Sequence, residues 1–248
     1  MIRVDRRNPK AVERGRALAT ILDLNALPER VCVVLGGDGH MLRVIHEQGP
    51  DWTYVGLNCG RVGFLLNEAE DLSAFSEALV SGAYTVREVP RLRATGLTRS
   101  HETVTGAALN DVYLERMSGQ TAHLRVLVDD TEVVERLVCD GLIVSTAIGS
   151  TAYSLAAGGP ACHASLQLTE LVAIAPHKPR MPPILLPPFA RITVEVHDAD
   201  RRPVRMVCDG RDHDDVVKVQ VDDSGSPVRL AFLLDHDPTR ALISKLVG

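Results

Sequence analysis

An apolar run that ends in a cluster of glycines constrains the fold of this chain more than any other feature. Residues 31–35, VCVVL, are uniformly apolar, as expected of a strand buried on both faces of a sheet. The segment GGDG follows at 36–39, and after it comes a helical pattern, HMLRVIHEQG. A strand-like run, TYVGLN, and helical patterns at 71–82 and 10–27 complete an alternation of strands and helices. This order predicts a parallel sheet with helices packed over it.

The pattern changes after residue 84. Strand-like runs bounded by turn residues succeed one another from 85 to 235, which predicts a second, mostly β region. A proline-rich stretch at 176–188 predicts a rigid, extended connector between strands. The last segment, DPTRALISKLVG, predicts a short helix that begins at Asp237 and Pro238.

Composition narrows the class of partner. A formal net charge of -5 and an aromatic content of 4% argue against a general nucleic-acid binder, which needs a basic surface and stacking rings. The sequence contains neither a membrane-length apolar run nor a signal-peptide pattern, so we expect no membrane association and a cytoplasmic location. The five cysteines lie mostly in apolar runs without a C-x-x-C pair, which predicts buried reduced thiols rather than a zinc site. The expected partner is a small molecule.

The GGDG segment has residues suited to a phosphate site. Gly36, Gly37 and Gly39 allow a ligand close to the main chain, and amides at the start of a helix face an anion. Asp38 follows a strand on the side where open α/β sheets bind ligands, so its carboxylate is a candidate to orient or deprotonate a hydroxyl, or to organise a metal. Arg43 is a candidate phosphate ligand one turn into the helix. The spacing matches neither the dinucleotide-binding nor the P-loop fingerprint, and a tight turn with an exposed aspartate and a solvated arginine is the competing interpretation.

A second polar cluster, CDGLIVSTAIGSTAYSLAAGGP, covers residues 139–160. Its hydroxyl groups suit the ribose and base edges of a nucleoside, and Asp140 offers an acceptor. A Ser/Thr-rich loop that caps a helix starting near Thr151 is the commoner explanation of such a pattern. Asn110 and Asp111 interrupt an alternating strand, either as a turn or bulge or as a sugar-binding pair. Phe64 lies in a further crossover turn, NCGRVGFLLN, where core packing is the simpler interpretation.

Six motifs occur in an order typical of one enzyme family. They are GGDG, CGRVGFL, LND, DGLIVSTAIGSTAYSLAAGGP, APHKPRMPPILLP and the CDG at 208–210. In this order they closely resemble the NAD kinase family, from about residue 31 to 211, and residues 140–160 are the most specific part. GGDG by itself is similar to the corresponding segment of diacylglycerol kinases, sphingoid kinases and phosphofructokinases.

The resemblance implies ATP-dependent phosphorylation of the adenosine 2'-hydroxyl of NAD, which gives NADP, with Mg²⁺ or another divalent ion held mainly by the nucleotide phosphates. It implies a Rossmann-like α/β N-terminal domain, similar to that of diacylglycerol kinases and phosphofructokinases, and a β-rich C-terminal domain. The C-terminal helix then returns to the first domain, so the expected domains are 1–90 with 236–248, carrying GGDG, and 91–235, binding NAD. A homodimer or homotetramer is also implied, and polyphosphate in place of ATP stays open.

Matched position by position, the resemblance gives roles to single residues. Asp38 becomes the catalytic carboxylate, with Gly39 beside it in the phosphate turn. Asn110 and Asp111 hold a ribose, and Asp140 contacts NAD. Further nucleotide-binding residues are Gly36, Gly37, Arg43, Phe64, Thr151, Ala152, Tyr153, Ser154, Leu155, Ala156, Ala175 and Arg211.

Several positions depart from the family pattern. His40 stands where a threonine normally follows GGDG, which replaces a hydroxyl near the donor phosphates by an imidazole. Asp111 replaces the usual glutamate, Ala147 and Ile148 replace a proline and a hydroxyl residue or similar, and Arg211 stands where glutamine is common. Fewer residues precede the glycine turn than in most relatives, so the first unit of the sheet is expected to be trimmed.

Two other functions remain as alternatives to an NAD kinase. One is a sensor that binds NAD or NADP without turnover, suggested by His40 and the short N-terminal segment. The other is a kinase for a lipid or sugar that shares only GGDG with the NAD kinases, and the cluster at 139–160 argues against it.

Overall fold

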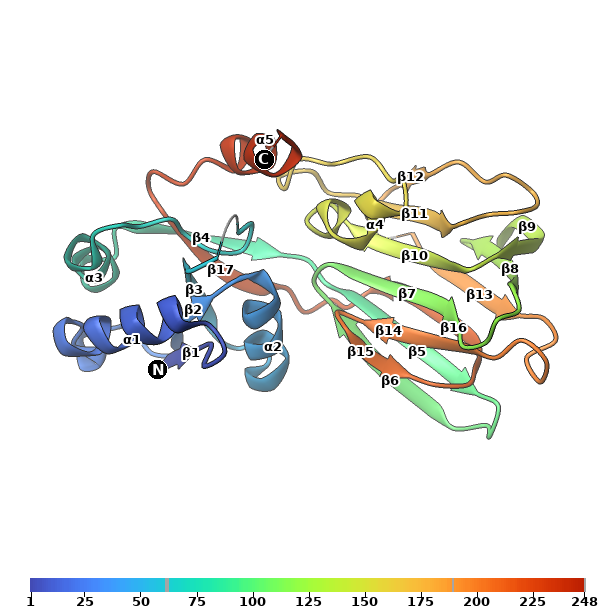
Figure 1. Ribbon diagram of the computed structural model, residues 1–248, viewed down its shortest axis with the longest axis horizontal. Helices are drawn as coiled ribbons and strands as arrows, with labels where there is room; N and C mark the ends of the chain where they lie inside the picture. The colour runs from blue at the N-terminus through green and yellow to red at the C-terminus, as the bar shows by residue number, and fades with distance from the viewer. Residues whose placement is uncertain (61–62, 189, 248) are drawn as a thin grey trace. The chain divides into compact units, whose positions relative to one another are not determined.

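The chain folds into two compact units. The computed structural model, drawn in Figure 1, describes residues 1–60, 63–188 and 190–247. One unit consists of Met1–Val89 with Ser226–Gly248, and the other is Pro90–Gly225.

The first unit contains a five-stranded sheet in the order β1-β2-β3-β17-β4. Its strands are β1 Ile2–Val4, β2 Val31–Gly36, β3 Thr53–Asn58, β4 Tyr84–Val89 and β17 Val228–Leu233. β1, β2, β3 and β17 are parallel neighbours, whereas β4 runs antiparallel to β17. The prediction of a parallel sheet holds for these four strands and not for β4, and an antiparallel edge strand is common on otherwise parallel sheets.

Residues at the helix ends determine where the helices of the first unit begin and end. These are α1 Pro9–Ile21, α2 Asp38–Gln48, α3 Leu72–Ser81 and α5 Pro238–Val247, with a 3-10 turn, η1, at Leu24–Ala26. Asp71 caps α3 by accepting hydrogen bonds from two main-chain amides, and Gly82 ends it in the left-handed region, as predicted. α1 ends before the predicted residue 27, because the Asp23 carboxylate accepts a hydrogen bond from the amide of Asn25 and starts the 3-10 turn.

Helices cover both faces of this sheet. Leu18 of α1 and Phe75 of α3 join Val33 of β2 in one buried cluster. α2 packs on the opposite face, where a Cβ at Gly56 would lie 2.7 Å from the Met41 Cε. The glycine therefore lets α2 lie directly on β3, which fixes where the GGDG turn emerges.

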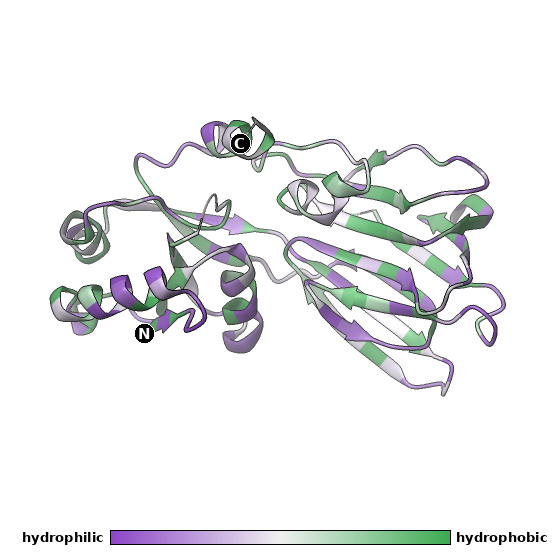
Figure 2. Cartoon of the chain, in the orientation of Figure 1, coloured by the Kyte–Doolittle hydropathy of each residue, from purple (hydrophilic) through white to green (hydrophobic). Residues whose placement is uncertain are grey.

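The second unit is a sandwich of two antiparallel six-stranded sheets. One has the order β12-β11-β10-β7-β14-β15 and the other β6-β5-β16-β13-β8-β9. The strands are β5 Leu92–Thr98, β6 Thr103–Ala108, β7 Asp111–Arg116, β8 Ala122–Val128, β9 Thr131–Cys139, β10 Gly141–Thr146, β11 Thr169–Ile174, β12 Ile184–Leu186, β13 Ile192–Val196, β14 Val204–Cys208, β15 Arg211–His213 and β16 Val216–Asp223. Two short helical turns, η2 Gly149–Thr151 and α4 Tyr153–Ala156, follow β10. Figure 2 shows apolar residues along the strands of this unit, and one buried cluster takes side chains from both sheets, among them Leu114 and Val194.

The second boundary between the units differs from the predicted position after residue 235. β17 belongs to the first unit, since it pairs with β3 and β4. The sequence marks β17 as a strand but contains no signal for its partner, because the pairing joins segments far apart in the chain. Part of the predicted proline-rich connector also differs, since Ile184–Leu186 forms the edge strand β12.

Two further expectations concern membrane-spanning helices and thiols. In the part of the chain that the structure describes, no helix is both long and apolar enough to span a bilayer. The five cysteines, Cys32, Cys59, Cys139, Cys162 and Cys208, are buried and unpaired as disulfides. The prediction of buried, reduced thiols is thus confirmed.

Candidate active site

The glycine turn joins β2 to α2 and leaves open space above its main chain. Gly37 is the N-cap of α2 in an extended conformation, with φ -116° and ψ 178°. A Cβ built on Gly37 or Gly39 meets no heavy atom within 4 Å, whereas one on Gly36 would lie 3.0 Å from the His40 Cβ. Neither strain nor packing inside the protein therefore requires glycine at 37 and 39. Their smallness instead keeps the amides at the N-terminus of α2 accessible, as an anion site needs.

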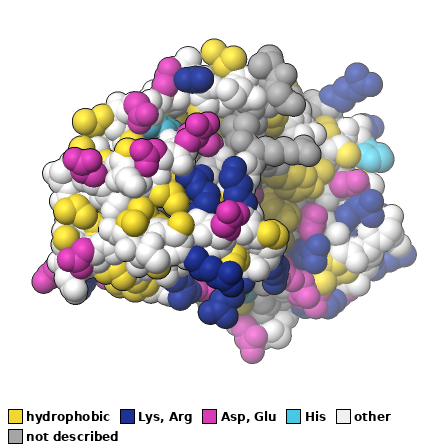
Figure 3. All heavy atoms as spheres, turned by 60° about the vertical axis from the view of Figure 1, so that its left-hand side comes forward, with side chains coloured by type: hydrophobic (Ala, Val, Ile, Leu, Met, Phe, Trp, Pro, Cys, Tyr) yellow, Lys and Arg dark blue, Asp and Glu magenta, His cyan; other side chains and the backbone are white. Residues whose placement is uncertain are grey.

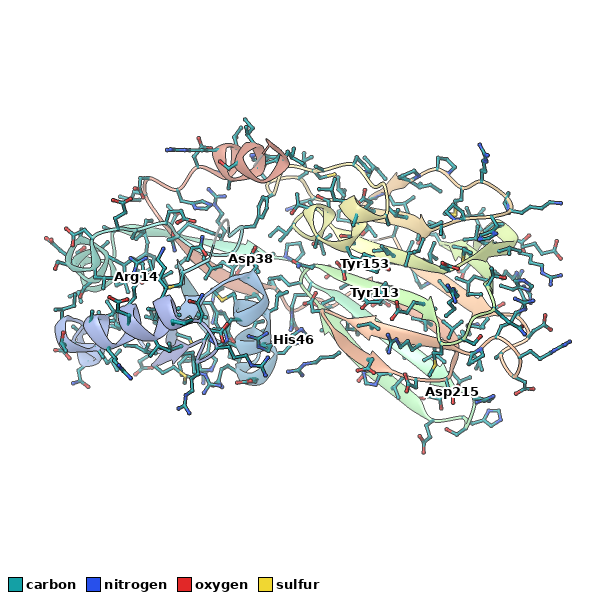
Figure 4. All side chains as sticks on the ribbon, in the orientation of Figure 1. Arg14, Asp38, His46, Tyr113, Tyr153 and Asp215 are labelled. Carbon is teal, nitrogen blue, oxygen red and sulfur yellow. The ribbon has the colours of Figure 1, made fainter. Side chains whose placement is uncertain are left out.

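Asp38 is the first residue of α2, and the loop after β3 holds its carboxylate in place (Figure 4). The amide of Phe64 donates to both carboxylate oxygens at 3.0 Å, and the amide of Leu65 donates to Oδ1 at 3.0 Å. A Cβ at Gly63 would lie 3.3 Å from the same Oδ1. The structure thus brings the two predicted site residues Asp38 and Phe64 together, and Phe64 contributes its main chain to this contact.

Arg43 and His40 lie on α2 beside the turn. The Arg43 guanidinium is 3.6 Å from the Asp5 carboxylate and 3.4 Å from the His40 Nδ1. Burial lowers the pKa of His40 below its usual value, so the imidazole is neutral at pH 7. Figure 3 shows basic and acidic side chains interspersed on the surface of the molecule that faces the viewer. Arg43 is therefore partly neutralised by Asp5 and sits at the margin of the turn.

In the second unit, Asp209 shapes the loop that leads into β7. Its carboxylate accepts hydrogen bonds from the amides of Leu109 at 2.7 Å, Asn110 at 3.0 Å and Asp111 at 3.3 Å. Asp209 itself has a φ of 46°, and Gly210 follows with a φ of 82°. The left-handed pair turns the chain between β14 and β15 so that the carboxylate faces the loop.

Asp111 is a buried carboxyl with an altered affinity for protons. Only 5% of the residue is exposed. Burial and then the nearby charge of Asp209 raise the pKa of Asp111 to about 7, while a hydrogen bond from the main-chain N–H of Tyr153 opposes the shift. Near neutral pH the group is present both as an acid that can donate to a hydroxyl and as a carboxylate that can accept from one.

The raised pKa of Asp111 predicts a pH-dependent cost in stability. The folded state binds this proton more tightly than the unfolded state, so the free energy of unfolding falls as pH rises from 3.8 to about 7. Asparagine does not titrate, so Asp111→Asn removes this pH dependence. The free energy of unfolding of the variant minus that of wild type therefore rises over this range by at most about 4 kcal/mol. Urea unfolding at pH 5, 6, 7 and 8 measures the difference.

The control for this prediction is Asp200→Asn, which changes a carboxylate of the same unit whose side chain is 86% exposed. Its difference from wild type should vary little with pH. A difference between wild type and Asp111→Asn that is constant from pH 5 to 8 contradicts the assigned environment of Asp111.

The segment 149–156 lies against the loop before β7. The Thr146 hydroxyl accepts from the amide of Gly149 at 3.1 Å and donates to the carbonyl of Leu109 at 2.7 Å. The Tyr153 ring packs edge-on against Tyr113 of β7, with centroids 4.9 Å apart (Figure 4). The predicted residues Asn110, Asp111 and Tyr153 are thus brought together at one end of the sheet.

Not every residue of this segment is available to a ligand. Ser154 has a relative exposure of 0%, and its hydroxyl donates to Glu170 in the interior. The more open side chains of the segment belong to Ala152, Tyr153, Leu155 and Ala156. The Ser154 side chain therefore faces the interior, and the other residues of the predicted stretch 151–156 stay candidates for lining a nucleotide pocket.

Asp140 and Ala175 lie at the other end of the same strands. β10 begins directly after Asp140 and reaches the level of Asp111 only at Ser145, which separates the main chain at Asp140 from that at Asp111 by roughly 17 Å at the rise of a strand. Ala175 follows β11, the antiparallel partner of β10, and so lies at the Asp140 end. The Asp140 carboxylate is bound by Arg116, with an Nε–Oδ1 distance of 2.7 Å. The predicted single pocket thus divides into two groups at opposite ends of one sheet.

Arg211 belongs to the group around Asp111. It begins β15 and pairs with Cys208, which lies opposite Val112 of β7. Arg211 is exposed, so its guanidinium is accessible to a ligand at this end of the sheet.

Comparison with known proteins identifies the group to which these features belong. Residues 109–224 match the family model described as the ATP-NAD kinase C-terminal domain. The NAD kinase of Cereibacter sphaeroides is 40% identical over 217 residues, which cover 86% of this chain and 84% of that protein. The chain belongs to the NAD kinase family. The NAD kinase of Zymomonas mobilis is 34% identical over 244 residues, covering 96% of this chain and 92% of that protein.

A solved member of the NAD kinase family has the same fold. The crystal structure of an NAD kinase from Archaeoglobus fulgidus in complex with ATP matches with a TM-score of 0.78 and 25% identity. The match covers 100% of this chain and 98% of that protein. The similarity therefore extends through both units rather than being confined to the segment matched by the family model.

Three residues of this NAD kinase family member were missed as candidates in the sequence. Asp209 had a signal, because it stands in the motif CDG before a glycine. Glu170 had one as well, since it is a lone acidic residue inside the apolar strand TELVAI. Tyr113 had none, because its place beside Tyr153 depends on how distant segments pair.

Proposed function

We propose that this protein transfers the γ-phosphoryl group of ATP to the adenosine 2'-hydroxyl of NAD and so produces NADP. The main support is the carboxylate of Asp38, held by two main-chain amides beside accessible amides at the start of α2. Family membership, shown by relatives named NAD kinase, gives the substrates. Phosphoryl transfer needs positioning and charge neutralisation more than covalent chemistry, and this turn supplies both.

In the proposed reaction Asp38 acts as the general base. It accepts the proton of the 2'-hydroxyl as that oxygen forms a bond to the γ-phosphorus. The bond between the γ-phosphorus and the bridging oxygen breaks, and ADP leaves with that oxygen and the bonding electrons. The hydrogen bonds from the amides of Phe64 and Leu65 fix the orientation of the carboxylate. The amides of the glycine turn stabilise the phosphate charge, since a helix N-terminus favours anions.

The second unit is proposed to recognise the dinucleotide. Asn110 and Asp111 hold ribose hydroxyls. The more exposed residues of the segment 152–156, Tyr153 among them, line the site of the nucleoside. Arg211, which is exposed at the same end of the sheet, is proposed to contact a phosphate or a base edge. Asp140 and Ala175 would contact a different part of NAD, because they lie at the opposite end of β10.

A divalent ion, Mg²⁺ or another, is proposed as the cofactor. When bound, it neutralises charge on the donor phosphates. No group of three or more His, Cys, Asp or Glu side chains converges in the described part of the chain. We propose that the nucleotide phosphates hold the ion. Polyphosphate is proposed as a second donor by the same chemistry.

The cytoplasm and a homodimeric or homotetrameric state are proposed as well. Five buried thiols without a disulfide fit a reducing compartment.

A substrate panel tests the proposed acceptor. Purified protein is incubated with labelled ATP and Mg²⁺ and with NAD, a diacylglycerol, a sphingoid base or a hexose. We expect label in NADP alone. Label in a lipid or sugar but not in NADP would refute the proposal and support a kinase that shares only GGDG.

A further inference from the structure

Glu170 of β11 is a fully buried carboxyl in an apolar strand. Its relative exposure is 0%, and the Ser154 hydroxyl donates to its Oε2 at 2.6 Å. Burial raises the pKa of Glu170, which favours the neutral form. Among the residues that the structure describes, no partner satisfies the second oxygen, Oε1. A buried carboxyl of this kind costs stability, so its presence calls for another explanation.

The carboxyl occupies the space that a glycine leaves vacant. A Cβ at Gly159 would lie 2.4 Å from the Ser154 Oγ and 2.7 Å from the Glu170 Oε1. The amide of Gly159 also donates to the carbonyl of Ser154 at 2.9 Å. Glu170, Ser154 and Gly159 therefore interlock and fix the turn that follows α4.

These contacts among Glu170, Ser154 and Gly159 lie one residue away from the proposed nucleotide site. Ser154 directly follows Tyr153, whose main-chain N–H donates to Asp111 and whose ring packs on Tyr113. α4 has only four residues and no side-chain cap. A helix this short is not stable by itself, so its position depends on such tertiary contacts.

We propose that Glu170 is a positioning residue for NAD: through the Ser154 hydroxyl it holds α4 so that Tyr153 and Asp111 keep the geometry that binds the nucleoside. The inference rests on the proposed function and adds a residue remote from the substrate to its binding site. Glu170 does not touch the dinucleotide in this account.

The test compares Glu170→Leu, Glu170→Gln and Thr169→Val with wild type. A leucine side chain has a similar volume but cannot accept the hydrogen bond from the Ser154 hydroxyl. A glutamine side chain can still accept it through its amide oxygen. Thr169 is the matched control, since it is 2% exposed, neighbours Glu170 in β11 and donates to the carbonyl of Pro188 at 3.4 Å, away from α4. NAD affinity is measured by calorimetry, and KM by NADP formation.

Glu170→Leu is expected to raise the Kd and KM for NAD between about threefold and tenfold, with the KM for ATP changed less than twofold. Glu170→Gln should restore values near wild type, and Thr169→Val should match wild type. An NAD affinity in Glu170→Leu equal to that of Thr169→Val overturns the proposal. If Glu170→Leu does not fold, Ser154→Ala replaces it, and an unchanged Kd for NAD in that variant overturns the proposal equally.

Calorimetry separates this inference from the proposed function. Wild-type protein that binds NAD but forms no NADP refutes the kinase, and the Kd comparison still decides the role of Glu170. Wild-type protein that binds no NAD overturns both.

Discussion

Replacing Asp38 by asparagine is expected to lower the rate of NADP formation between about a hundredfold and ten-thousandfold, the range for loss of a general base. Asparagine cannot accept the proton of the 2'-hydroxyl. Its amide oxygen still accepts a hydrogen bond from the loop after β3, so the turn should keep its conformation. The Kd for NAD should change little, since Asp38 acts on the reacting hydroxyl. Initial rates measured with a cycling assay specific for NADP test this.

Asp71→Asn is the matched control for Asp38→Asn. Asp71 is an aspartate at the start of another helix of the same unit, and its carboxylate accepts from the amide of Ser73 at 2.8 Å. Asparagine caps helices as well as aspartate does, so stability and rate should both remain near wild type. An Asp38→Asn enzyme as fast as Asp71→Asn would remove the carboxylate from the mechanism.

Gly149→Ala is expected to destabilise the second unit by on the order of 3 kcal/mol. The new Cβ would lie 2.0 Å from the carbonyl oxygen of Asn110, so the main chain must move. That same oxygen accepts hydrogen bonds from the Thr146 amide at 2.9 Å and the Ser145 hydroxyl at 3.2 Å. Thermal unfolding should show a Tm lower by roughly 6–12 °C, and NAD binding should weaken with it.

Gly119→Ala separates this steric effect from the general effect of adding a methyl group. A Cβ at Gly119 meets no heavy atom within 4 Å. Its Tm should therefore equal that of wild type or exceed it slightly. Equal stability of the Gly149 and Gly119 variants would show that the tight approach to Asn110 is not present in the folded protein.

Local features of the first unit could be predicted from sequence because they depend on adjacent residues. The run 31–35 forms β2, the glycines begin α2, and Asp71 and Gly82 bound α3. The three-residue strand β1 escaped prediction, since three residues are too few to show a period. Its place at the sheet edge depends on pairing with β2.

The residues of the candidate site could be predicted from the sequence, but their arrangement in space could not. The motifs identify Asp38, Asp111 and Asp140 as candidate site residues. Only strand pairing shows that Asp140 and Asp111 lie at opposite ends of β10. Pairing also brings Asp209 to the amides before β7 and Glu170 beneath Ser154. These contacts join positions far apart in sequence, so no local pattern encodes them.

The most direct test of the account is the time course of NADP formation by the purified wild-type protein with NAD, ATP and Mg²⁺, read together with the Kd for NAD. The account predicts that NADP accumulates over many turnovers, one for each ADP released. Tight binding of NAD without NADP would contradict it and identify the protein as a sensor of the dinucleotide.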